Sequence, residues 1–147
     1  MTQEEIKQYL SSYYYLSKKV DSLREELRYL EILADGTNSQ PFDEPRVQKT
    51  PSQKAPFLRY IDKITNKQKE IDDKLTVLLE LKDEIQNVIS SVDDPVMELV
   101  LTYRYINFYD WNDLAKKLHY AESYVFKIHR KALSVIQQKK IVKGSKT

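Results

Sequence analysis

Apolar residues recur at spacings of three and four along the first quarter of the chain, and this pattern constrains the fold most strongly. The series consists of Ile6, Tyr9, Tyr13, Leu16, Val20, Leu23, Leu27 and Leu30. Such spacing places all of these side chains on one face of a helix, as in the heptads of a coiled coil. The sequence therefore predicts a helix over about residues 3–33. Asp35 and Gly36 follow, and glycine commonly ends a helix in the left-handed conformation, so we expect the helix to stop there.

A second heptad series follows a segment that is rich in proline and polar residues. Pro41, Pro45 and Pro51 predict a loop over residues 35–54, because proline interrupts both helices and central strands. The later series predicts a helix over about residues 56–92, and its members are Ile61, Ile64, Ile71, Leu75, Leu78, Ile85, Ile89 and Val92. Apolar faces of this length do not stay exposed to water. We expect the first series to form the seam of a hairpin within one chain, of a homo-oligomer (a dimer is favoured), or of both.

The remainder of the chain predicts three shorter helices. Asp94 and Pro95 suit the N-cap and first position of a helix, and Asp110 suits the N-cap of another helix over residues 111–118. Residues 119–121 then predict a turn before a last helix that begins at Glu122. The predicted fold is all-α, with long heptad helices over residues 1–93. A three-helix helix-turn-helix domain over residues 94–141 and a basic tail over residues 142–147 follow.

Charge is distributed unevenly between these parts. Residues 1–95 hold 14 Lys and Arg against 18 Asp and Glu, whereas residues 96–147 hold 10 against 4. A basic half on an acidic scaffold indicates a polyanionic partner at the C-terminal end. A solvated basic tail would explain the excess of lysine at the end of the chain. It would not explain the bases inside the last predicted helix.

The last predicted helix carries bases on the face that its apolar residues leave free. Val125, Ile128, Ala132 and Leu133 define the inward face. The candidate DNA-binding residues are Glu122, Ser123, Tyr124, Phe126, Lys127, Arg130 and Lys131, together with Lys116 and Lys117 of the preceding helix. Arg and Lys suit guanine edges and phosphates, Glu accepts from the cytosine amino group, and Phe126 suits contact with a thymine methyl. The structural alternative is a solvated helix whose aromatic residue packs under the long N-terminal helices.

Residues 94–136 resemble the fourth conserved region of bacterial sigma-seventy factors. The resemblance rests on Leu101, Arg104-Tyr105, Trp111, Leu114-Ala115, Leu118, Val125 and Ala132-Leu133. The layout is closer still to small phage-encoded regulators of the ArpU and RinA late-gene activator type. The resemblance implies a DNA-binding transcription regulator in which Glu122, Ser123, Phe126, Lys127 and Arg130 face the major groove. The sequence departs from the pattern at His119, where glycine is usual, and at Ala121, where Ser or Thr is usual.

Other functional classes receive less support from the sequence. The chain has no cysteine, its two histidines have no acidic partners at metal-ligand spacing, and no glycine-rich phosphate loop is present, so we expect neither an enzyme, nor a cofactor, nor a metal site. No segment predicts a signal peptide or membrane span, and we expect a cytoplasmic protein. The alternatives to a regulator are a coiled-coil interaction protein, a sigma-domain mimic that binds RNA polymerase or another protein, and a small-terminase-like protein that recognises DNA for packaging.

Overall fold

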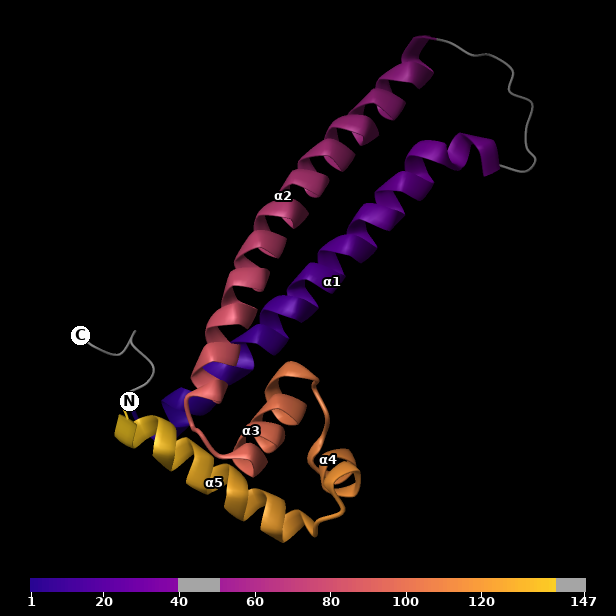
Figure 1. Ribbon diagram of the computed structural model, residues 1–147. Helices are drawn as coiled ribbons and strands as arrows, with labels where there is room; N and C mark the ends of the chain where they lie inside the picture. Colours follow the sequence, from indigo (N-terminus) through magenta and orange to yellow (C-terminus); the bar gives the residue numbers. More distant parts are fainter. Residues whose placement is uncertain (40–50, 140–147) are drawn as a thin grey trace. The chain divides into compact units, whose positions relative to one another are not determined.

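The computed structural model describes the backbone of residues 1–39 and 51–139, and the side chains of residues 1–35 and 58–139 (Figure 1). The elements in chain order are α1 (Gln3–Ser39), α2 (Pro51–Ser90), α3 (Pro95–Leu101), the π-helical segment η1 (Thr102–Ile106), α4 (Trp111–Leu118) and α5 (Glu122–Lys139). The predicted all-α fold is confirmed, because α1 and α2 form a long hairpin and three shorter helices pack together after it. None of the described helices is both long and apolar enough to span a membrane.

The two long helices extend further than the sequence predicts. α1 continues through Gly36 to Ser39, so the predicted stop at Asp35 and Gly36 is wrong. A single glycine costs a helix only about 1 kcal/mol relative to alanine, which a long helix tolerates. α2 begins at Pro51, before the predicted start at residue 56, because proline is accommodated in the first turn of a helix. The rest of the predicted loop, residues 40–50, and the predicted tail lie outside the described residues.

The chain forms two compact units, and each includes parts of both long helices. One unit joins Met1–Ser17 to Leu78–Thr147, and the other is Lys18–Val77. The predicted boundary at Asp94 does coincide with the start of α3. It does not separate the compact units, because the C-terminal helices belong to the same unit as the first turns of α1 and the last turns of α2.

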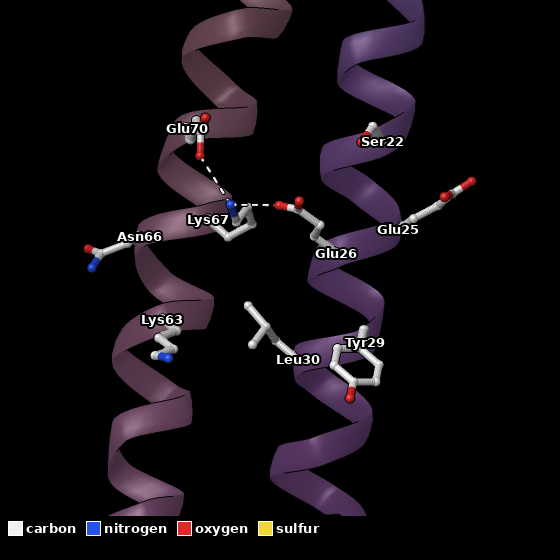
Figure 2. A pocket seen from close by; sticks show the side chains of 9 residues that line it. All are labelled: Ser22, Glu25, Glu26, Tyr29, Leu30, Lys63, Asn66, Lys67 and Glu70. Atoms are coloured by element: carbon white, nitrogen blue, oxygen red, sulfur yellow. Dashed lines mark hydrogen bonds and ion pairs between the residues drawn. The ribbon is translucent and has the colours of Figure 1, made fainter.

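In the unit Lys18–Val77, α1 and α2 pack through their heptad positions. Val20, Leu23 and Ile71 are buried, and Leu27 and Leu30 are half-buried. At the edge of this packing, Lys67 Nζ lies 2.8 Å from Glu26 Oε1 and 3.3 Å from Glu70 Oε1 (Figure 2). The seam of α1 is therefore engaged within a single chain, which confirms the hairpin, whereas pairing between chains stays a prediction.

The other unit has a core to which α1, α2, α3, η1 and α5 all contribute. Buried residues of this core are Ile6 and Leu10 of α1, Ile85, Val88 and Ile89 of α2, Val92 just beyond α2, Leu101, Tyr105, and Ala132, Leu133 and Ile136 of α5. Leu10 is fully buried although it lies outside the predicted seam. A second cluster joins α3, α4 and the first half of α5, through Val100, Leu114, Ala115, Val125 and Ile128. The C-terminal helices thus have one core cluster of their own and share the other with α1 and α2.

Side-chain caps define the starts of α3 and α4, as the sequence predicts. Asp94 Oδ1 accepts hydrogen bonds of 3.0 Å from the backbone N–H groups of Val96 and Met97, and Pro95 occupies the first helical position. Asp110 Oδ1 accepts a 2.8 Å hydrogen bond from the N–H of Asp113. Each cap satisfies a backbone donor that has no partner within the helix.

The chain bends more sharply between α3 and α4 than the sequence predicts. After Leu101 the helix widens into η1, where the N–H of Asn107 bonds to the carbonyl of Thr102 at 2.9 Å. Phe108 then adopts a left-handed conformation with φ 65°, which is strained for a bulky residue. The N–H of Tyr109 closes the bend by bonding to the carbonyl of Tyr103 at 2.9 Å. Apolar periodicity through Ile106 predicts a helix here but gives no signal for its widening.

One buried polar pair connects η1 to α5. The hydroxyl of Tyr105 lies 2.7 Å from His129 Nε2, and both side chains are buried. Burial lowers the pKa of His129 from 6.5 to about 4, and the positive charges of Lys7, Arg104 and Arg130 act in the same direction. Burial also raises the pKa of Tyr105 to about 12. The pair is therefore neutral near neutral pH, and each group satisfies the other's hydrogen-bonding requirement.

Replacing Leu10 tests whether the C-terminal helices depend on the first turns of α1. We expect Leu10→Ala to lower the free energy of unfolding by about 2–5 kcal/mol, because it removes a fully buried side chain from the shared core. Urea unfolding followed by circular dichroism measures this loss. Leu79→Ala is the matched control, since Leu79 is 60% exposed. Equal effects of the two substitutions would contradict the shared core.

Protonation of His129 should destabilise the fold in acid. The unfolded chain binds this proton below pH 6.5 and the folded chain only below about 4, so stability is complete above pH 6.5 and falls as the pH drops through that interval. The loss attributable to His129 is at most about 3 kcal/mol. Urea unfolding at a series of pH values should show a shallower pH dependence in the Tyr105→Phe plus His129→Phe variant. The control is His119→Gln, which removes an exposed histidine, and an effect as large as that of the double variant would exclude this assignment.

Candidate nucleic-acid interface

The candidate interface is built from α4, a short turn and α5. α4 ends at Leu118 and α5 begins at Glu122, so residues 119–121 make the connection, as the sequence predicts. The N–H of Tyr120 bonds to the carbonyl of Ala115 at 2.9 Å, and the N–H of Val125 bonds to the carbonyl of Ala121 at 3.1 Å. Backbone hydrogen bonds therefore anchor the turn to both helices.

His119 occupies the left-handed position that ends α4. Its φ of 61° and ψ of 42° are those that glycine adopts most readily at a helix C-terminus. Histidine is one of the residues that tolerate this conformation better than most. Its N–H bonds to the carbonyls of Ala115 and Lys116, so the helix ending is kept without glycine. Ala121, before α5, has no side-chain oxygen that could cap the helix.

α5 has one buried face and one exposed face. The buried residues are Val125, Ile128, His129, Ala132, Leu133 and Ile136. On the exposed side lie Glu122, Ser123, Tyr124, Lys127, Arg130 and Lys131, all of which the sequence proposes as DNA-binding. Lys116 and Lys117, in the last turn of α4, are also exposed. Eight of the nine proposed DNA-binding residues are thus accessible.

Phe126 is the exception in exposure. Its side chain is half-buried, and its ring packs against that of Trp111 with a centroid separation of 5.0 Å. Contact of its remaining exposed edge with a thymine methyl stays a prediction. The ring connects α5 to α4. The alternative to DNA contact placed this ring under the long N-terminal helices, whereas its packing partner is Trp111 of α4.

Trp111 is the centre of a stack that supports the interface. The Arg104 guanidinium lies 4.5 Å from the centre of the indole ring, and the His129 ring lies 4.8 Å from it, edge to face. Arg104 also donates a 3.0 Å hydrogen bond from Nη1 to the carbonyl of Tyr109. These contacts connect η1, α4 and α5.

The exposed bases have no internal counter-charges. In the part of the chain that the structure describes, no ion pair involves Lys116, Lys117, Lys127, Arg130 or Lys131. Glu122 is the one acidic side chain within α5. The face therefore presents unneutralised positive charge to a partner.

Two exposed tyrosines at the start of α5 add an aromatic feature to this face. Tyr120 and Tyr124 are 36% and 48% exposed, and their rings pack edge to face with centroids 4.9 Å apart. Tyr124 was among the proposed residues, whereas Tyr120 was not. Tyr120 lies four residues before Tyr124, and this spacing is the sequence signal that would have indicated that the two rings share a face.

Aromatic side chains also gather where α1 meets the bend after η1. The ring of Phe108 packs against those of Tyr13 and Tyr14, with centroid separations of 5.4 and 5.0 Å. Together with Arg104 and Asp110, Tyr14 and Phe108 line a hollow of about 320 Å³. Tyr13 and Tyr14 of α1 therefore pack against the strained bend at Phe108. Among the described residues, no three His, Asp or Glu side chains converge as a metal site would require.

Comparison with known proteins identifies no relative of this chain. No protein-family model matches it, and neither the curated proteins nor the solved structures contain a significant match.

Proposed function

We propose that this protein is a sequence-specific DNA-binding regulator of transcription. In this proposal α4, the turn and α5 act as a helix-turn-helix, and the N-terminal half of α5 enters the major groove. The resemblance to sigma region four and to phage late-gene activators favours a phage protein that controls late or packaging genes in the cytoplasm of a bacterial host. No cofactor and no catalytic step are part of this function.

One observation carries the proposal: the solvent face of α5 is basic and unpaired while its opposite face is locked into the core. A recognition helix needs an apolar face to fix it and accessible side chains that reach base edges and phosphates. Val125 and Ile128 supply the first requirement, and Lys127 and Arg130 the second. Lys116 and Lys117 extend the positive surface onto α4, where they suit contact with a phosphate backbone.

The remaining exposed residues of α5 suggest how bases are read. Arg130 is suited to a bidentate contact with guanine, and Glu122 can accept a hydrogen bond from cytosine. Ser123 offers both a donor and an acceptor near the start of the helix, the end that contacts bases in such motifs. RNA polymerase is a second partner in this proposal, which follows from the sigma-like spacing of the sequence.

Removing two bases tests the proposed face. We expect Lys127→Ala plus Arg130→Ala to weaken binding to DNA selected from a random pool by at least about tenfold, since a good base contact contributes about 1–3 kcal/mol. Each lost phosphate contact should also reduce the slope of log affinity against log salt by about 0.9. Mobility shifts at several salt concentrations measure both quantities.

The control removes equal charge from another surface. Arg59→Ala plus Lys69→Ala deletes two exposed bases of α2 and should leave affinity nearly unchanged. Equal losses in both double variants would indicate binding by net charge alone. Salt-dependent binding that survives the α5 substitutions would reject this face, and failure to bind any duplex at low salt would favour the protein-binding alternative.

A conservative change separates base reading from attraction to phosphate. We expect Arg130→Lys to retain most non-specific affinity but to lose base preference at one position, because lysine keeps the charge without the planar bidentate fork. Repeating the DNA selection with this variant measures the change. Lys131→Arg serves as a control on the adjacent exposed position. An unchanged preference after Arg130→Lys would remove Arg130 from the base-reading set.

A further inference from the structure

An open groove runs between α1 and α2 within the unit Lys18–Val77. Its volume is about 600 Å³, and the residues that line it include Glu25, Glu26 and Tyr29 of α1 and Lys63, Lys67 and Glu70 of α2 (Figure 2). Leu30 projects from α1 into the space between the helices and forms part of the floor. None of these residues belongs to the proposed DNA-binding face.

The two walls of the groove carry opposite net charge. Glu25 and Glu26 make the α1 wall acidic, whereas Lys63 and Lys67 outnumber Glu70 on the α2 wall. Lys67 is already held by Glu26 and Glu70, at 2.8 and 3.3 Å. Glu25 and Lys63 are exposed, and neither has an ion pair in the described part of the chain. One charge on each wall thus remains available to a partner.

Large apolar side chains lie on the same side of α1 as the acidic wall. Tyr29 is 62% exposed and Ile32 is 57% exposed. Together with Glu25 they follow a spacing of four and three, which places them on one helical face. A partner that covered the groove would remove these side chains from water and would place an opposite charge near Glu25.

We propose that the occupant of this groove is the same groove of a second copy of the chain, so that two hairpins form a four-helix bundle. A two-fold axis parallel to the helices sets α1 of each copy opposite α2 of the other. The acidic wall of one copy then meets the basic wall of its partner, and this occurs twice. A two-fold axis across the helices would instead place the acidic walls against each other.

The surface that remains after hairpin formation supports this assignment. The heptad seam packs within the chain, apart from the part of Leu30 that lines the groove, so a dimer must use a further face of the hairpin. A hairpin face about 30 Å long and about 20 Å wide buries roughly 1,200 Å² when two copies meet, which reaches the size of specific interfaces. Buried area alone does not fix the affinity of such an interface. The proposal does not depend on DNA binding by α5.

Charge reversal of the full-length protein tests the interface. Sedimentation equilibrium should show a dimer for the original sequence. Glu25→Lys and Lys63→Glu should each weaken it by at least about tenfold, because each change creates two repulsive contacts by symmetry. Mixing the two single variants should restore a heterodimer, because both contacts across the axis then pair opposite charges. The double variant should restore the homodimer for the same reason.

Controls separate this interface from loss of folding and from DNA binding. Lys69→Glu reverses an exposed charge that does not line the groove and should leave the mass unchanged. Circular dichroism should show equal helix content in all variants, and Lys127→Ala plus Arg130→Ala should remain dimeric. A monomeric original sequence at high micromolar concentration would overturn the proposal. So would a dimer that neither charge reversal weakens, or weakened variants that do not recombine on mixing.

Discussion

The apolar face of α5 is longer than α3 and α4 can cover, and the organisation of its unit follows from this constraint. Val125 and Ile128, in the first half, pack with the short helices, whereas Leu133 and Ile136, in the second half, pack with Ile6, Leu10, Ile85 and Ile89. The same helix thus closes two core clusters. Its second half would be exposed in a domain that began at Asp94, which explains why the compact unit also includes the start of α1 and the end of α2.

Polar and aromatic contacts then fix how α5 is held between these clusters. His129 lies at the transition, bonded to Tyr105 and in edge-to-face contact with Trp111. Trp111 in turn contacts Phe126 and the Arg104 guanidinium. A buried hydrogen bond has a strict distance and angle, so it restricts the rotation of α5 more than apolar packing alone does. The rotation of α5 decides which residues face outward, so the buried pair contributes to the orientation of the basic face together with the apolar packing of Val125 and Ile128.

Periodicity, capping and charge made most of the fold predictable from the sequence. Spacings of three and four located the long helices. Asp94 and Asp110 located the starts of two short helices, because a carboxylate before a helix accepts hydrogen bonds from the backbone N–H groups of the first turn. Three features escaped prediction for physical reasons. Gly36 resembled a stop, but helix propensity is weak against the continuation of a long paired helix. Phe126 resembled an outward residue, but a large ring can turn towards a neighbouring helix. Leu10 lies one position beyond the seam, and only tertiary packing shows that α5 covers it.

The basic face of α5 and the groove of the hairpin differ in their pattern of charge, and this difference bears on both proposed interactions. The bases of α5 lie on a face with a single acidic residue, whereas the groove in the hairpin opposes an acidic wall to a basic one. A surface of one sign attracts a polyanion such as DNA over a distance limited by the Debye length, about 8 Å at physiological salt. A surface with both signs gains nothing from a polyanion, but it complements its own copy after a two-fold rotation. The sign pattern of each surface therefore selects a different class of partner, and the two interactions do not compete for the same residues.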